Sequence, residues 1–316
     1  MSDLLLVGLA GFLASIVDGA LGMGFGPTSS SILLATGISP AAASTTVNLA
    51  KVATGVVAGA SHWHFGNIDR PLVLRLAIPG AVGALAGATV LVNVDGDDLR
   101  PILAVLLLLV GLRILVRFSR ALPTSPDKPP AGDSPAAFDL RGVPAAAMAG
   151  GVTNGLVGAW GPVVTPFLLH RGLPPRYAVG SVNTAEVAVA VVAAGSLVTA
   201  LGSEGLEVGV VLAMLAGGMI AAPLAAYVVR YLPPRLLGLA VAGLLLMTQV
   251  RELAGALDIG PARWLAYAAA PAAVVLAALR PRIARRRRLR RARALDVGRC
   301  DVDGSDLSSA HAAQAR

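Results

Sequence analysis

The sequence is poor in charged residues, in aromatic residues and in cysteine. Charged residues make up 14% and hydrophobic residues 55% of the 316 positions, and the mean hydropathy is +0.73. A soluble protein of this length has roughly a quarter charged residues, so an ordinary soluble domain is excluded. Cys300 is the only cysteine, which excludes an internal disulfide, a cysteine-based zinc site and an iron–sulfur cluster within one chain.

Enzyme signatures are also missing. The sequence has no G-x-S-x-G nucleophile motif, no H-E-x-x-H metal motif and no phosphate-binding loop. We therefore predict a protein that is not an enzyme and that holds neither a cofactor nor a metal ion.

Apolar runs are what the sequence has in abundance, recurring from Leu4 to Leu279 among 36 glycines. They predict an all-α polytopic membrane protein, because small residues let membrane helices pack closely. The run at Leu4 has no basic region before it and is predicted to belong to the mature protein. The formal charge of +8 depends on an arginine cluster between Arg280 and Arg293. This cluster predicts a cytoplasmic C-terminus that contacts anionic lipid in the cell (inner) membrane, and no nucleic-acid partner.

The chain matches itself at a constant offset, the one that separates Lys51 from Glu186. Two homologous halves are therefore predicted. The matched segments are G-I-S-P at Gly37 with G-L-P-P at Gly172, S-T-T-V-N-L-A-K at Ser44 with V-G-S-V-N-T-A-E at Val179, and, with one deletion, Asp18–Pro27 with Asn154–Pro162.

Each half is predicted to hold one element broken at a Gly-Pro pair, followed by three long transmembrane helices. One extra C-terminal transmembrane helix follows the second half. The predicted parts are a first repeat at 1–118, a flexible cytoplasmic linker at 119–142, a second repeat at 143–253, an extra helix at 254–279 and an Arg-rich, disordered cytoplasmic tail at 280–316. The predicted helices are 4–21, 28–36, 40–62, 71–92 and 99–118 in the first half, and 143–157, 162–170, 175–201, 206–230, 234–253 and 262–279 afterwards.

The distribution of Lys and Arg decides between two arrangements of the halves. If the broken elements enter the membrane and return on the same side, the linker and the basic loop at 62–70 are cytoplasmic, and the acidic loop at 93–98 is outside. The two halves are then inverted, an architecture of secondary transporters. If the broken elements span, the halves are parallel and most basic loops lie outside. The charges favour the inverted arrangement.

The two Gly-Pro breaks are candidate anion sites. Each break frees backbone N–H groups within the membrane and starts a new helix, whose N-terminus attracts negative charge. The alternative is that these glycines only permit tight helix packing. The candidate binding residues at the breaks are Gly26, Pro27 and Thr28 in the first half, and Trp160, Gly161 and Pro162 in the second.

Lys51 and Glu186 fall near the middle of matched helices of membrane-spanning length. A charged side chain at that depth is a functional candidate by default. Asn48 and Asn183 precede them by three residues and share their helix faces. Lys51 is predicted to bind an anionic solute, and Glu186 to neutralise Lys51 or carry a coupling proton. Asp18 is a second coupling candidate, and the alternative is a structural ion pair.

His62, His64 and Asp69 cluster at one helix end. They permit a metal site, and with it a membrane-embedded enzyme or metal-dependent protein. An interfacial belt with Trp63 is the interpretation we favour.

The sequence resembles the sulfite exporter TauE/SafE family, also called the 4-toluene sulfonate uptake permeases. The motifs that carry the resemblance are G-A-L-G-M-G-F-G-P, G-N-I-D-R, P-G-A-V-G-A-L-A-G-A and G-S-V-N-T-A-E, within residues 4–253. The resemblance implies transport of sulfite or an organosulfonate. Together with the site, it predicts a secondary transporter of a small anion by alternating access, with a homo-oligomer possible. A carboxylate or other anion, and a structural or signalling subunit, are the alternatives.

Overall fold

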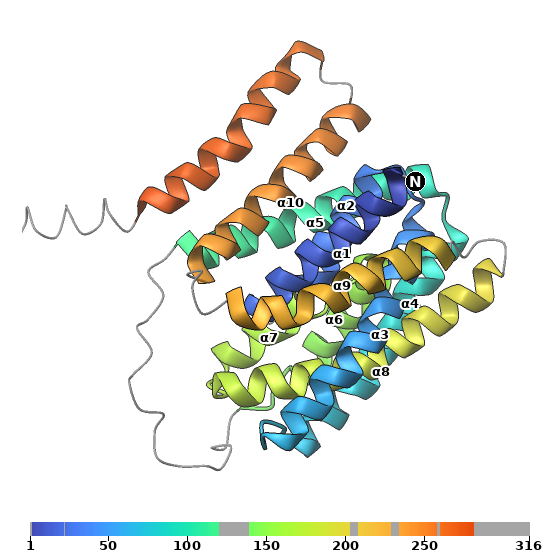
Figure 1. Ribbon diagram of the computed structural model, residues 1–316, viewed down its shortest axis with the longest axis vertical. Helices are drawn as coiled ribbons and strands as arrows, with labels where there is room; N and C mark the ends of the chain where they lie inside the picture. Colours follow the sequence, from blue (N-terminus) through green and yellow to red (C-terminus); the bar gives the residue numbers. More distant parts are fainter. Residues whose placement is uncertain are drawn as a thin grey trace, which may run out of the picture.

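The computed structural model describes residues 2–21, 23–119, 139–202, 208–228, 234–257 and 260–280. All regular secondary structure in these ranges is helical, as the sequence predicts (Figure 1). Most of the predicted linker and nearly all of the Arg-rich tail lie outside them. The helices are α1 (Ser2–Leu21), α2 (Phe25–Ala35), α3 (Pro40–His64), α4 (Arg70–Asn93), α5 (Gly96–Ser119), α6 (Val143–Val157), α7 (Gly161–His170), α8 (Pro175–Leu201), α9 (Val208–Val228), α10 (Pro234–Ala256), the short 3-10 turn η1 (Gly260–Ala262) and a last helix at 263–280.

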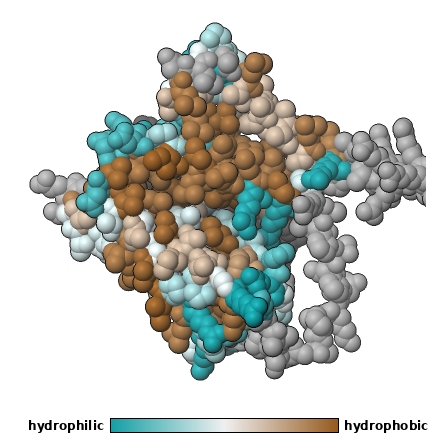
Figure 2. All heavy atoms as spheres, turned by 180° about the vertical axis from the view of Figure 1, so that it is seen from behind, coloured by the Kyte–Doolittle hydropathy of each residue, from teal (hydrophilic) through white to brown (hydrophobic). Residues whose placement is uncertain are grey.

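Helix α4 shows how side-chain size is distributed in this fold. Between residues 80 and 88 its buried positions are all small, among them Gly80, Gly83 and Gly87, whereas Leu74 and Ile78 are exposed. Large exposed apolar side chains suit contact with lipid, and small buried ones suit close contact between helices. Figure 2 shows a broad hydrophobic surface on one face of the molecule, with hydrophilic residues at its margins.

Within the described part of the chain, four helices are long and apolar enough to cross a membrane: residues 70–93, 96–119, 176–201 and 235–256. The chain is therefore a multi-pass membrane protein. Helix α3 is not one of the four, and it buries the polar residues Ser44, Thr45, Asn48 and Lys51. The other spans that the sequence predicts stay predictions.

Two pairs of helices pack along each other through glycine and run in the same direction. In the pair α1 and α9, Gly209 lies against Leu4, Gly8 against Ala213 and Gly218 against Ser15, so the contacts advance together along both helices. A Cβ atom on Gly11 would come within 2.3 Å of the Met214 carbonyl oxygen, so no side chain fits there. The pair α4 and α6 is built in the same way.

Two other helix pairs run in opposite directions. Gly55 of α3 faces Val187 of α8, whereas the later residue Gly59 faces the earlier residue Thr184. Helices α5 and α10 are also antiparallel. There Gly111 faces Leu245 and Leu246, whereas Phe118 faces Gly238.

The element formed by α6 and α7 returns to the end from which it starts. Gly142, just before α6, lies against Phe167 and Arg171 at the end of α7. Arg171 also forms an ion pair with Asp139. The chain therefore enters the bundle with α6 and leaves it on the same side with α7.

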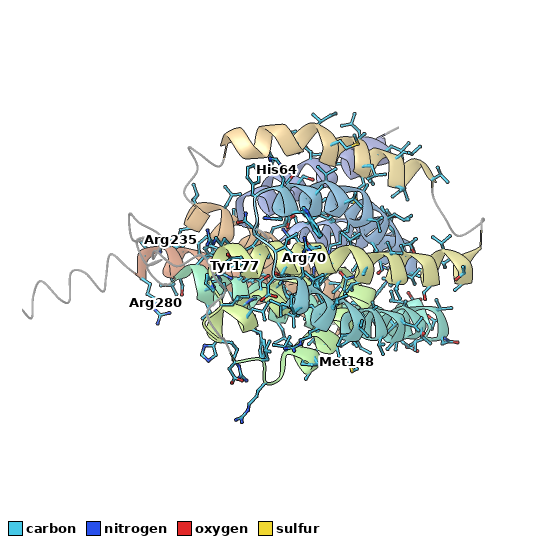
Figure 3. The ribbon with its side chains drawn as sticks, turned by 90° about the horizontal axis from the view of Figure 1, so that it is seen from below. His64, Arg70, Met148, Tyr177, Arg235 and Arg280 are labelled. Atoms are coloured by element: carbon cyan, nitrogen blue, oxygen red, sulfur yellow. The ribbon has the colours of Figure 1, made fainter. Side chains whose placement is uncertain are left out.

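The last helix packs on α5 and α10, beside α10 in Figure 1. Arg235, at the start of α10, donates hydrogen bonds to the carbonyl oxygens of Ala277 and Ala278 at 3.0 and 2.9 Å. Arg280 donates to Ser119 Oγ at 3.2 Å, at the same end of the bundle (Figure 3). The predicted helix at 262–279 is thus confirmed as a helix, and its crossing of the membrane stays a prediction.

Candidate functional site

The first Gly-Pro break is held by Asp18. Its Oδ1 accepts hydrogen bonds from the backbone N–H groups of Gly24 and Phe25, at 3.0 and 3.3 Å, at the start of α2. The helix begins at Phe25, so Pro27 lies inside its first turn, where a missing N–H costs nothing. A carboxylate of the chain itself therefore occupies part of the predicted anion site. Gly22, which the sequence places in this break, lies outside the described residues.

The second break depends on Gly158, which ends α6 with φ of 68°, in the left-handed region that favours glycine. Its backbone N–H donates to the Asn154 carbonyl at 2.8 Å. Helix α7 then begins at Gly161, with Pro162 next, and no side chain of the described residues caps it through a hydrogen bond. The two breaks touch, because a Cβ atom on Gly26 would lie 1.8 Å from the Gly158 carbonyl oxygen.

Lys51 lies where the two breaks meet. Its side chain is only 6% exposed, and Nζ donates to Asn154 Oδ1 at 2.9 Å and to the Gly158 carbonyl at 2.6 Å. The third partner is Glu186 Oε1, in a close ion pair. An ammonium group has three protons, so all three are used.

An amide network fixes the orientation of these partners. Asn154 Nδ2 donates to Asn48 Oδ1 at 2.7 Å, while Asn48 Nδ2 donates to the Ser44 carbonyl at 2.9 Å. Ser44 Oγ in turn donates to the Gly155 carbonyl at 2.6 Å. Because every one of these groups is buried, each bond also removes the cost of an unpaired polar atom.

A cavity of about 60 Å³ adjoins Lys51. It has room for a few water molecules or a small anion. Along α3 its lining passes from Lys51 to Thr54 and Ala58, toward the end of that helix. The lining residues are Asp18, Met23, Gly24, Phe25, Gly26, Lys51, Thr54, Gly55, Ala58, Gly161, Pro162 and Glu186.

Five of the binding residues that the sequence nominated do not line the cavity: Pro27, Thr28, Asn48, Trp160 and Asn183. The indole N–H of Trp160 donates to the Val182 carbonyl at 3.1 Å, in a fully buried position. Asn183 approaches His62 Nε2 at 3.4 Å rather than Lys51. Thr28 is buried without lining the cavity, and its binding role, like those of Trp160 and Asn183, stays a prediction.

Some buried hydroxyl groups near the breaks lack a hydrogen-bond partner within the described part of the chain. They belong to Thr28 and Ser29 of α2 and to Thr165 of α7. Buried hydroxyls are normally paired with protein or water. These three are therefore candidates for contact with water or solute.

The histidine cluster does not form a metal site among the described residues, where no group of three His, Cys, Asp or Glu side chains is suitably placed. Asp69 instead caps α4 by accepting from the Leu72 N–H at 3.1 Å. The ring of His64 packs edge-on against Phe65, and Arg70 lies over the exposed Trp63 ring. Aromatic and basic groups gathered in this way are typical of a membrane interface.

Comparison with known proteins identifies the family of the chain. The family model of the sulfite exporter TauE/SafE matches residues 7–252, nearly the whole bundle. The chain belongs to the sulfite exporter TauE/SafE family. It is also 40% identical over 254 residues to the "Probable membrane transporter protein YtnM" of Bacillus subtilis (strain 168), covering 80% of this chain and 83% of that protein. No solved structure matches the chain.

As a member of the TauE/SafE family, the chain is a membrane transporter rather than an ordinary soluble protein. The sequence did not predict that Gly158 and Asn154 contact Lys51. It also did not predict that Ser44 belongs to the hydrogen-bond network that orients these partners. One signal was available for Asn154, because it matches Asp18 in the repeat. No sequence signal points to a backbone carbonyl such as that of Gly158.

Proposed function

We propose that this protein moves a small anion across the membrane by alternating access, with sulfite or an organosulfonate as the substrate. The observation that carries the proposal is the buried Lys51 beside Glu186, in a cavity that both helix starts reach. An uncapped helix start and a buried ammonium group both attract negative charge. The family and the small cavity volume support a compact anion such as sulfite.

The charges in the cavity support a proposal for how transport is coupled. Lys51 is one cation beside two carboxylates, those of Asp18 and Glu186. An added anion would place three negative charges beside one positive charge in a buried site, which is unfavourable. A proton bound by Glu186 would release Lys51 for the anion. We therefore expect a proton to accompany the anion.

The helix directions support two inverted repeats at 1–118 and 143–253. Helices α3 and α5 run antiparallel to their counterparts α8 and α10. Repeats related by an axis along the membrane normal would make these counterparts parallel, whereas an axis in the membrane plane makes them antiparallel. On this basis the broken elements α1–α2 and α6–α7 re-enter, and the solute site lies at the midplane.

The orientation follows from the basic residues. Arg70, Arg141 and Arg171 lie on the side where α3 ends, whereas Asp95 and Asp97 lie on the other side. The positive-inside rule places the first side in the cytoplasm. By the same rule we expect the linker and the Arg-rich tail on that side, toward which the central cavity also extends.

The test is solute flux in proteoliposomes. Lys51→Ala is expected to abolish uptake of radiolabelled sulfite and sulfonates, because the buried cation that lines the cavity is gone. The double variant Lys51→Ala with Glu186→Gln removes the unpaired carboxylate, and it should fold yet stay inactive. Arg113→Ala is the control, since it removes an exposed cation from α5. Normal flux in either Lys51 variant would reject the anion-binding role.

A further inference from the structure

A second polar cluster lies between α2 and α10, outside the Lys51 site. Ser31 Oγ and Thr248 Oγ1 are 2.5 Å apart, and Gln249 Nε2 donates to Ser31 Oγ at 2.7 Å and to Thr248 Oγ1 at 3.0 Å. Ser31 and Gln249 are buried. Together with Arg100 and Glu252 these residues line a small cavity.

The cluster lies on the side opposite the one toward which the central cavity extends along α3. Helix α2 starts at the central cavity and leads to Ser31, about one and a half turns later. Helix α2 ends near Gly37, whose carbonyl oxygen accepts a hydrogen bond from Arg100 Nη2 at 3.3 Å. Polar groups therefore extend from the Lys51 site toward the side on which α3 begins.

An ion pair closes the outer end of this cluster. Arg100 Nη1 lies 3.9 Å from Glu252 Oε1, which joins the start of α5 to the last turns of α10. Both side chains are about one-third exposed, so water can solvate them when they separate. A contact of this kind is easily broken and reformed.

The matched positions on the other side of the protein do not offer an equivalent pair. At the offset that matches Lys51 with Glu186, Arg100 matches Arg235 and Glu252 matches Arg117. Two arginines repel each other, so these positions cannot close in the same way. Arg117 instead contacts Met23 of the central cavity lining, on the side toward which that cavity extends.

We propose that Ser31, Thr248 and Gln249 line the second half of the anion path, and that the Arg100–Glu252 pair is its gate. The proposal rests on the transport function proposed above. In the present conformation the gate is shut, and the lining of the Lys51 cavity extends toward the opposite side. Opening separates α5 from α10 at the pair and exposes Ser31 to water.

The test is thiol labelling of Ser31→Cys in a Cys300→Ser background, with a membrane-impermeant maleimide applied to vesicles of known orientation. Glu252→Gln and Arg100→Gln should each speed labelling of the thiol introduced at position 31 several-fold, from the side where α3 begins. The matched control is Asp97→Asn, because Asp97 also lies 3.9 Å from Arg100 but is exposed. The reversed pair Arg100→Glu with Glu252→Arg should slow labelling again.

Equal rates of labelling at position 31 in Glu252→Gln and Asp97→Asn would contradict the proposed gate. Fast labelling of Ser31→Cys while the Arg100–Glu252 pair is intact would also contradict it. Leu34→Cys, partly exposed beside the same cavity, should react in every variant and reports that the reagent reaches this side. Labelling needs no transported solute, so failure of the gate and failure of the Lys51 site are separate results.

Discussion

At the scale of residues, competition for one ammonium group governs the site. Lys51 Nζ donates its three protons to Asn154 Oδ1, the Gly158 carbonyl oxygen and Glu186, so no donor is left for a solute. Of these partners, only Glu186 can lose its charge by taking up a proton. Binding of an anion and protonation of Glu186 are thus expected to be linked.

Glu186→Gln tests this linkage. The amide oxygen still accepts from Lys51, so the variant should fold, but it cannot exchange a proton. We expect anion binding, measured by thermal shift, to persist while anion-dependent proton uptake, measured with a pH dye inside proteoliposomes, is lost. Asp97→Asn serves as a control because Asp97 is exposed and distant in sequence from the residues that line the cavity. Unchanged proton uptake in Glu186→Gln would remove Glu186 from the coupling step.

The contact between Lys51 and Glu186 was foreseeable from their matched positions in two antiparallel helices. The contact with Asn154 was only partly foreseeable, and that with the Gly158 carbonyl was not, because any residue type offers a carbonyl. Trp160 shows the opposite case. Its indole N–H suggested a solute donor, but tight packing against Gly80 and Gly150 directs it to Val182.

At the scale of elements, glycine decides which helices meet. The pair α4 and α6 approaches so closely that a Cβ atom on Gly151 would lie 2.0 Å from the Gly80 carbonyl oxygen. Lipid is as apolar as the side chains, so association depends on this close packing rather than on the hydrophobic effect. The pair supports α8, with which α4 also packs, and α8 carries Glu186.

Gly151→Ala is predicted to destabilise the protein, because its methyl group would overlap backbone that cannot move aside. Overpacking of this kind costs about 1–3 kcal/mol. Gly195→Ala in α8 is the matched control, since a Cβ atom there meets nothing within 4 Å. It should be neutral or stabilising, because alanine favours a helix more than glycine does. Thermal unfolding in detergent compares the two, and equal midpoints would contradict the packing argument.

Helix positions followed closely from the sequence, including the ends at the second break, but the start of the helix after the first break did not. The predicted helix at 28–36 begins at Phe25 in the structure, because Asp18 caps it from six and seven residues away. Composition and turn residues are local signals. A cap that reaches across a break depends on how the two segments fold back on each other.

At the scale of the whole molecule, contacts between helices show which of them run in the same direction. The start of α6 and the end of α7 lie together through Gly142 and Phe167. Helix α4 runs parallel to α8, since Asp69 meets Ser181 and Gly80 meets Val189. These contacts are what re-entrant elements and inverted halves require.

Single cysteines test this topology. In a Cys300→Ser background, Arg141→Cys, Gly172→Cys and Gly66→Cys should all be labelled by an impermeant maleimide from the cytoplasmic side. Asp97→Cys should be labelled only from the other side, because α4 separates it from Gly66. Labelling of positions 141 and 172 from opposite sides would mean that α6 and α7 together span the membrane and that the halves are parallel.

The sequence by itself determined the class of protein and its helices, and it predicted the duplication and singled out Lys51 and Glu186. These properties follow from local composition and from similarity between segments of one chain. Only the tertiary structure decided that Lys51 is held by three partners, that Asp18 occupies the start of α2, and that a polar cluster leads to Arg100 and Glu252. Each of these depends on helices distant in sequence being brought into contact, which glycine packing permits but no local pattern specifies.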